Sequence, residues 1–214
     1  MRARRSSADP RILLVSCYGD SEPQFRGILT AATELLRRGR IMHARAPLPC
    51  NPTNPEQKAS EVILCGHGSP DSPQVGTARI VTPAELRPFA PLRVYLLCCH
   101  QGRRDIRSSW ASGSGLPVER VMGHAEETES ALSTMFVTHL LYDKPPRLDE
   151  LFEQWRRANS YLAPWFSFIR STYQDTKGDA LATMLRVEQT VDLSPVRPYV
   201  EVVRSFPRYF DGLI

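Results

Sequence analysis

Two stretches decide the fold of this chain of 214 residues: VILCGHGS at residues 62–69 and VYLLCCHQG at residues 94–102. Each is a run of apolar, β-favouring residues that ends abruptly in polar or nucleophilic side chains. Short apolar runs of this kind, bounded by Gly and Pro, predict buried strands of a parallel sheet. Because sites in open α/β sheets form at the carboxyl ends of the strands, we expect His67 and Cys99 to meet at that edge.

The rest of the chain alternates between strand and helix patterns. We expect strands over residues 11–17, 41–46, 61–65, 92–98 and 118–123, and a short edge strand over 78–81. Helices are expected over residues 23–38 and 128–142, and a short one starts at Pro83, with Thr82 as N-cap and Glu85 as its capping-box partner. The alternation predicts an α/β protein with a mainly parallel central sheet and helices on both faces.

Composition shifts suggest how the chain is divided. Residues 1–10 are expected to form a flexible arm, residues 11–143 the α/β core that holds both motifs, and residues 144–214 a C-terminal helical extension packed on that core. Within this last part, we expect helices over 148–158 and 179–188 and one strand over 199–203. Residues 47–58 and 102–117 are rich in turn-forming residues, so we expect loops there, with Trp110 in the second.

Bulk properties argue against several classes of protein. The net charge is only +4, and no basic stripe with interleaved aromatics supports nucleic-acid binding. No stretch approaches the roughly 18 apolar residues of a membrane span. The five cysteines are odd in number and no export signal precedes them, so we expect reduced thiols in a cytoplasmic protein. The residue pattern calls for no cofactor.

The two strand ends carry the chemistry of nucleophilic catalysis. Adjacent residues on a strand face opposite sides, so only one of Cys98 and Cys99 points into a cleft. Cys98 suits a buried, inert position, whereas the chain leaves the sheet at Cys99. His67 lies between Gly66 and Gly68, which allow a sharp turn and a close approach to substrate. The N–H groups of Gly68 and Cys99 are candidates for binding an oxyanion.

This combination resembles the caspase–hemoglobinase group of cysteine peptidases, and CHAT-type domains in particular. Their pattern is an apolar strand ending in His-Gly, followed by a second ending in Cys with a Gly three residues later, here His67-Gly68 and Cys99 with Gly102. Residues 77–86 resemble the short strand and helix between those motifs, and residues 118–123 and 130–141 resemble the strand and helix after the cysteine. The resemblance implies a caspase-like fold in which Cys99 is the nucleophile, His67 the general acid/base, and peptide bonds are cut.

Specificity leaves several interpretations open. Asp20 follows the first strand at the same edge, and some relatives carry an acid in a similar place that receives Arg or Lys; a solvated loop acid is the alternative. Arg103 and Arg104 would instead favour an acidic substrate. Glu126, Glu127 and Glu129 precede a helix and suit its dipole. The expected partner is a protein or peptide substrate. Since the sensor domains that often accompany CHAT domains are absent from this sequence, the expected protein is either a stand-alone peptidase or a subunit controlled by a separate regulatory protein.

Three alternatives compete with this hypothesis. In the first, Cys98 rather than Cys99 attacks, although the spacing to Gly102 favours Cys99. In the second, the chain is an inactive binding or scaffold module of the same fold. In the third, Cys65, His67, Cys99 and His100 hold a metal ion, although the paired spacing of a closed zinc site is missing. His124 is the main rival for a histidine in the cleft.

Overall fold

The computed structural model describes residues 11–19, 21–48 and 59–211. The expected N-terminal arm (residues 1–10), Asp20, Cys50 and most of the connection over residues 47–58 lie outside the described residues.

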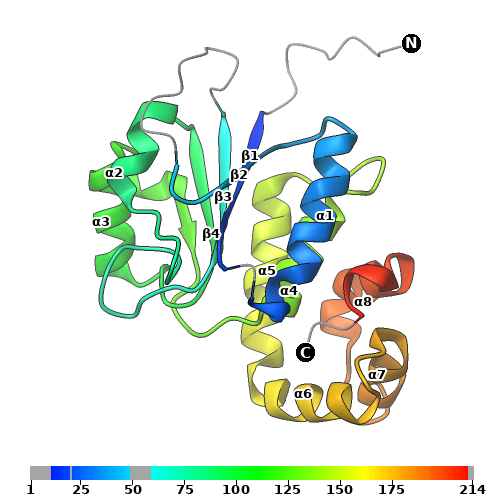
Figure 1. Ribbon diagram of the computed structural model, residues 1–214. Helices are drawn as coiled ribbons and strands as arrows, with labels where there is room; N and C mark the ends of the chain where they lie inside the picture. Colours follow the sequence, from blue (N-terminus) through cyan, green and yellow to red (C-terminus); the bar gives the residue numbers. More distant parts are fainter. Residues whose placement is uncertain (1–10, 20, 49–58, 212–214) are drawn as a thin grey trace.

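In the described part of the chain, five strands form one parallel sheet in the order β2-β1-β3-β4-β5. Their bounds are β1 (Ile12–Cys17), β2 (Met42–Arg45), β3 (Glu61–Gly66), β4 (Arg93–Leu97) and β5 (Val121–Gly123). Figure 1 shows α2 and α3 on one side of this sheet and α1, α4 and α5 on the other. The protein is therefore an α/β protein with helices on both faces, as the alternation of patterns predicts.

The chain reverses its direction of travel across the sheet between β1 and β3. From β1 it moves outward to β2, and from β3 it moves the opposite way through β4 to β5. Crevices form outside the carboxyl ends of the strands at such a reversal. The end of β3, where His67 follows, lies at this point.

Alternate residues of the central strands are buried in two separate hydrophobic cores, one on each face of the sheet. Ile63, Cys65, Tyr95 and Leu97 belong to the core beneath α1, α4 and α5. Val62, Leu64, Val94 and Leu96 belong to the core beneath α2 and α3. A strand buried on both faces must be apolar at nearly every position, which is why β3 and β4 are continuous hydrophobic runs.

The helices predicted over residues 23–38 and 128–142 and from Pro83 are present, the first two with shorter bounds. The helix bounds are α1 (Arg26–Arg37), α2 (Pro83–Leu86), α3 (Arg104–Ser114), α4 (Ser130–His139), α5 (Leu148–Leu162), α6 (Phe166–Asp175), α7 (Ala180–Val187) and α8 (Arg197–Ser205). A short 3-10 turn, η1 (Pro23–Phe25), leads into α1. The capping box at α2 is present as predicted, because the Glu85 carboxylate accepts a hydrogen bond from the Thr82 N–H at 2.7 Å.

The C-terminal helices share the core of the sheet. Leu151, Phe152 and Trp155 of α5 are fully buried in the same cluster as the strand residues, and the Phe152 ring lies 5.7 Å from that of Tyr95. Helices α6, α7 and α8 continue from α5 at the lower right of Figure 1, below and beside α1 and α4.

Residues 102–117 are not the loop that their composition predicts. Residues 104–114 form α3, which buries Ile106, Trp110 and Ala111 against the sheet and ends at Gly115 with φ of 77°. Arg104, Ser108, Ser109 and Ser112 are exposed on its outer surface. The three apolar residues, at spacing i, i+4 and i+5, are the helical signal that the surrounding composition concealed.

Two predicted strands are also wrong. Residues 199–203 belong to α8, where Tyr199, Val202 and Val203 are buried at helical spacing and tertiary packing overrides the β propensity of Val. Residues 78–81 form no strand; Val81 makes only an isolated bridge to Val75. The strand predicted over residues 118–123 is shorter, because residues 118–120 form a 3-10 turn before β5.

None of the helices in the described residues has the length and apolar character required to cross a bilayer.

Candidate active site

His67 and Cys99 lie at one rim of the sheet and on one face of it. Along β3, Ile63 and Cys65 face the core beneath α1, α4 and α5, and His67 continues this alternation. Along β4, Tyr95 and Leu97 face the same core, and Cys99 continues it. Because β3 and β4 are parallel neighbours with Cys65 opposite Leu97, the next residues on this face, His67 and Cys99, leave the sheet side by side.

The backbones of the two strand ends touch at Gly68. A Cβ atom placed on Gly68 would lie 1.9 Å from the carbonyl oxygen of Cys99 and 3.1 Å from its nitrogen. Any residue other than glycine would therefore push the two strand ends apart. Gly102, three residues after Cys99, makes a second close approach, since its Cβ would lie 2.4 Å from the backbone of Gly123. These contacts explain the need for glycine at both positions.

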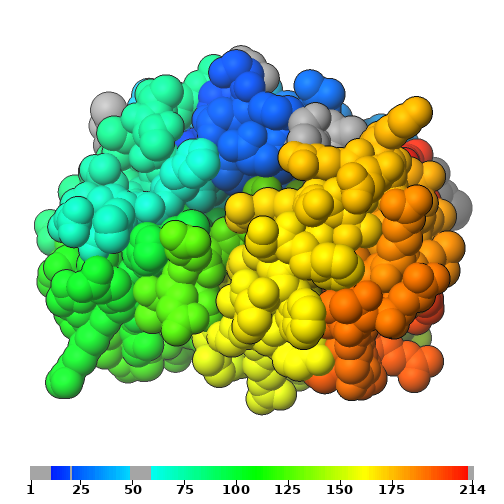
Figure 2. Space-filling model, turned by 90° about the horizontal axis from the view of Figure 1, so that it is seen from below, coloured from blue at the N-terminus to red at the C-terminus, as the bar shows by residue number. Residues whose placement is uncertain are grey.

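Figure 2 shows this rim of the molecule face on. The segments that follow β1 (blue), β3 (cyan), β4 (green) and β5 (light green) come together towards its centre, beside the yellow and gold α5 and α6. The rim therefore combines residues from widely separated parts of the sequence.

The Cys99 sulfur is held from the side of β5. The Thr128 N–H donates to the sulfur at 3.3 Å, and the Thr128 hydroxyl lies 3.6 Å from it. Thr128 stands two residues before α4. A backbone N–H aimed at a sulfur is one of the surroundings in which cysteines act as nucleophiles. Cys99 is partly exposed, so the thiol is within reach of solvent.

The His67 ring is held from the side of β1. Its Nε2 lies 2.6 Å from Oε2 of Glu22, and the other carboxylate oxygen of Glu22 accepts a hydrogen bond from the Gly19 N–H at 2.7 Å. A carboxylate only accepts hydrogen bonds, so Nε2 carries the proton and Nδ1 remains the basic nitrogen. The ring edge packs on Phe25, with the ring centroids 5.2 Å apart. Glu22 and Phe25 thus fix both the tautomer and the tilt of the imidazole.

Within the described residues, no hydrogen bond joins the Cys99 sulfur to the His67 ring. The sulfur contacts Thr128, and the ring contacts Glu22. The two groups leave adjacent strand ends on one face, but each is held by the segment on its own outer side. Catalytic hydrogen bonds commonly tighten only once substrate is bound.

Two backbone N–H groups at this rim have no hydrogen-bond acceptor among the described residues. Neither the N–H of Gly68 nor that of Cys99 donates a hydrogen bond to any described residue, whereas Gly76 N–H, nearby, donates to the His67 carbonyl at 2.7 Å. These are the two donors that the sequence suggests for an oxyanion. Free N–H groups beside a nucleophile are suited to stabilise negative charge on a carbonyl oxygen.

A buried glutamine ties the loop after β3 to the loop after β4. Gln101 is fully buried; its amide nitrogen donates to the carbonyl of Ser69 at 2.6 Å, and its amide oxygen accepts from the Trp110 indole at 2.6 Å. Trp110 thus anchors this network from α3 and lines no groove. Arg103 adds a bond to the Pro70 carbonyl at 3.1 Å. The segment after His67 is therefore positioned from the face of the sheet opposite the thiol.

The other described cysteines lie in the cores. Cys98 is 1% exposed in the core beneath α2 and α3, and Cys17 and Cys65 are fully buried. Burial raises the pKa of all three thiols above the ordinary value of 9.0. A thiol that does not ionise is a poor nucleophile, so the geometry favours Cys99 over Cys98 as the reactive sulfur.

Several other predicted site residues lie elsewhere. Asp20 is outside the described residues. His124 is 4% exposed, with its ring 5.9 Å from that of Trp155, and burial lowers its pKa, so it is a packed side chain. Arg104 is exposed on the outer surface of α3.

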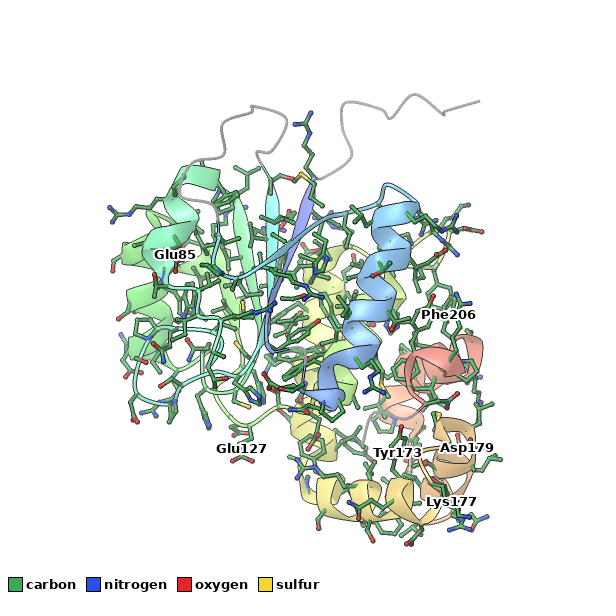
Figure 3. The ribbon with its side chains drawn as sticks, in the orientation of Figure 1. Glu85, Glu127, Tyr173, Lys177, Asp179 and Phe206 are labelled. Carbon is green, nitrogen blue, oxygen red and sulfur yellow. The ribbon has the colours of Figure 1, made fainter. Side chains whose placement is uncertain are left out.

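The acidic residues before α4 have separate surroundings. Glu127 projects away from the ribbon at this rim, as Figure 3 shows. Glu126 is exposed, and Glu129 pairs with Arg170 of α6. The Glu129 N–H donates at 3.0 Å to the side chain of Asn159, a fully buried residue of α5.

The proposed metal ligands do not form a site in the described structure. No group of three or more His, Cys, Asp or Glu side chains among the described residues is arranged to hold a metal ion. Cys65 points into the core and is fully buried, on the inner side of His67.

Sequence reasoning missed three residues that support the pair. Glu22 lies two residues beyond Asp20, on the same loop after β1, so its position at the rim was the available signal. Thr128 and Gln101 act through a backbone N–H and through a buried amide, and nothing in the local sequence marks either role.

Comparison with models of protein families, with curated proteins and with solved structures finds no match to this chain.

Proposed function

We propose that this protein is a cysteine peptidase in which Cys99 attacks the peptide bond and His67 transfers the protons. The observation that carries the proposal is that these residues directly follow the adjacent ends of β3 and β4 on one face of the sheet, where Gly68 touches the Cys99 backbone. The resemblance of both strand ends to CHAT-type domains gives independent support from the sequence. The substrate is a protein or peptide, and the unpaired thiols suit the reducing environment of the cytoplasm.

The reaction begins with transfer of the Cys99 thiol proton to Nδ1 of His67. The sulfur then forms a bond to the scissile carbonyl carbon, and the carbonyl π electrons move to its oxygen. The N–H groups of Gly68 and Cys99 donate to this oxyanion. When the oxyanion collapses, the C–N bond breaks, and imidazolium delivers its proton to the leaving amine.

Hydrolysis of the thioester restores the enzyme. His67 takes a proton from water as the water oxygen bonds to the thioester carbon. The C–S bond then breaks to release the carboxylic acid product, and the sulfur leaves as a thiolate that recovers the proton from His67. Every proton removed in this cycle is returned, so the reaction consumes only one water per bond.

Glu22 is a positioning residue in this mechanism. It holds Nε2–H of His67 and so keeps Nδ1 available towards the thiol, and its negative charge stabilises the imidazolium that forms in both steps. Because Gly19 fixes the carboxylate in turn, the loop after β1 sets the orientation of the base.

The proposal is tested with a library of fluorogenic peptides and the Cys99→Ala variant. We expect the wild-type protein to cleave a subset of the library and Cys99→Ala to show no cleavage above background. Cys98→Ala is the matched control, because it removes the neighbouring sulfur from the opposite face and should retain most of the activity. Activity that survives in Cys99→Ala and is lost in Cys98→Ala would overturn the assignment of the nucleophile.

A second candidate function is a binding module of the same fold without catalysis. The absence of a hydrogen bond between the sulfur and the His67 ring favours it to that extent. The two functions differ in their response to a peptide electrophile. Formation of a covalent Cys99 adduct that requires His67, compared with His67→Ala, supports the peptidase; an adduct formed equally well without His67 supports the binding module.

A further inference from the structure

A large cavity lies on the same side of the sheet as the candidate active site, lined by residues that follow Glu22 and Thr128 in the sequence. Its volume is about 440 Å³, within the roughly 300–1,000 Å³ range of ligand pockets. Helices α4, α6, α7 and α8 supply its walls, together with η1 and the end of α5. Figure 3 marks Tyr173 and Phe206 in this C-terminal helical region.

The cavity begins where the supports of the catalytic pair end. Glu22, which holds His67, is followed directly by Pro23 and Gln24, and both line the cavity. Thr128, which holds the Cys99 sulfur, is followed directly by Glu129 and Ser130, and both also line it. The two short segments that position the base and the thiol therefore both continue into the cavity wall, where η1 and α4 are in contact.

The lining is apolar and carries no unbalanced charge. Its walls are mainly aliphatic and aromatic side chains, among them Met135, Phe166, Ile169 and Met184. The charged residues of the lining are Glu129 and Arg170, and these pair with each other. A charged group of a ligand in this cavity would have no unpaired opposite charge to bind, so the cavity favours a neutral apolar group.

We propose that this cavity receives a large apolar side chain of the substrate, from the residue immediately before the scissile bond. The inference rests on the proposed peptidase function and names its specificity. The residue before the bond carries the carbonyl that stays attached to Cys99 through both steps, so a pocket next to the pair holds this half throughout. A leucine, methionine or phenylalanine side chain buries its surface there, whereas arginine or aspartate would bring a charge into an apolar site.

The experiment separates binding from chemistry. Blocked tripeptide amides that differ only in the last residue (Gly, Leu, Phe, Arg or Asp) are titrated into the Cys99→Ala protein by calorimetry. The matching coumarin amides are given to the wild-type protein as substrates. We expect Leu and Phe peptides to bind at least tenfold more tightly than the Gly, Arg and Asp peptides, the effect of burying one large side chain. The kcat/KM values should follow the same order.

A matched pair of variants locates the binding. Ala131 of α4 lines the cavity, and Ala131→Phe fills part of it; Ala182 of α7 lies outside the lining, and Ala182→Phe adds the same ring there. We expect Ala131→Phe to abolish the preference for Leu and Phe, and Ala182→Phe to preserve it. Circular dichroism and unfolding curves of both variants establish that each is folded.

Each outcome bears on one proposal. Equal binding of all five peptides, or an Ala131→Phe variant that retains the preference, overturns the assignment of the cavity. Selective binding without any cleavage by the wild-type protein overturns the peptidase and leaves the cavity as an apolar peptide-binding site. Selective binding with cleavage in the same order supports both.

Discussion

The two faces of the sheet are equally buried at mid-strand but differ at the carboxyl rim. On the face covered by α2 and α3, the last residues remain inside: Gly66 is buried against Cys17 and Val75, and Cys98 is 1% exposed. On the face covered by α1, α4 and α5, the next residues, His67 and Cys99, emerge partly exposed. A shift of one residue along the strand therefore separates an inert thiol from a reachable one.

The largest expected effect concerns the reactivity of the two neighbouring thiols. In a Cys50→Ser background, which removes the cysteine outside the described residues, iodoacetamide should modify Cys99 on the order of a hundredfold faster than Cys17, Cys65 or Cys98, because burial raises the pKa of those three thiols. Peptide mapping by mass spectrometry at pH 7.5 measures the rates. Comparable modification rates at Cys98 and Cys99 would contradict the difference in thiol accessibility between the two faces.

A second expectation concerns the contact that joins the strand ends. Gly68→Ala places a methyl group 1.9 Å from the Cys99 carbonyl oxygen, so β3 and β4 must separate at the rim. We expect a loss of unfolding free energy at the upper end of about 1–3 kcal/mol, measured by urea denaturation, together with the loss of peptide cleavage. Gly115→Ala is the control: its φ of 77° costs about 1 kcal/mol, but its methyl group meets nothing within 4 Å. Equal losses in the two variants would contradict the close approach.

A third expectation concerns the face covered by α2 and α3. Trp110→Phe keeps most of the buried ring but removes the indole N–H, leaving the fully buried Gln101 amide oxygen without its donor. We expect a loss of about 1–2 kcal/mol in urea denaturation. Trp165→Phe serves as the comparison, since Trp165 is only partly buried. If the two variants are equally stable, Gln101 does not depend on α3 for its hydrogen bond.

The smallest expected effect is a loss of stability at acidic pH from buried histidines on the face covered by α1, α4 and α5. His139 of α4 and His124 beside α5 are buried, and burial lowers the pKa of each below its ordinary value of 6.5. The unfolded chain therefore binds protons more readily, so this contribution to stability is complete above about pH 6.5 and is lost as the pH falls below it. Urea denaturation at pH 7.5 and 5.5 should show lower stability at the acidic pH. The His139→Gln variant should show a smaller difference between the two, and an unchanged difference would contradict this origin.

Much of the fold could be predicted because its signals are local. The unbroken apolar runs of β3 and β4 allow only strands buried on both faces, and Thr82, Pro83 and Glu85 specify a helix start within four residues. That His67 and Cys99 follow neighbouring parallel strands could be predicted from topology alone, but the contact that each makes, with Glu22 or Thr128, could not.

The missed elements depend on contacts between distant residues. Helix α3 has a polar composition, and only its packing against the sheet distinguishes it from a loop. The valines of α8 favour strand in isolation and become helical because Tyr199 and Val202 bury together. Glu22 contacts His67 across 45 positions of sequence, and the side chains that line the apolar cavity come from five helices and two 3-10 turns, so no local sequence pattern predicts either contact.

The hydrogen bond from the Glu129 backbone to Asn159 has a practical consequence for anyone dividing this protein into smaller pieces. A fragment cut after residue 143 would keep every strand and both reactive groups, yet it would lose the α5 side chain that secures the chain immediately after Thr128. The sulfur would then lack a fixed neighbour on that side. Expression boundaries should therefore include α5.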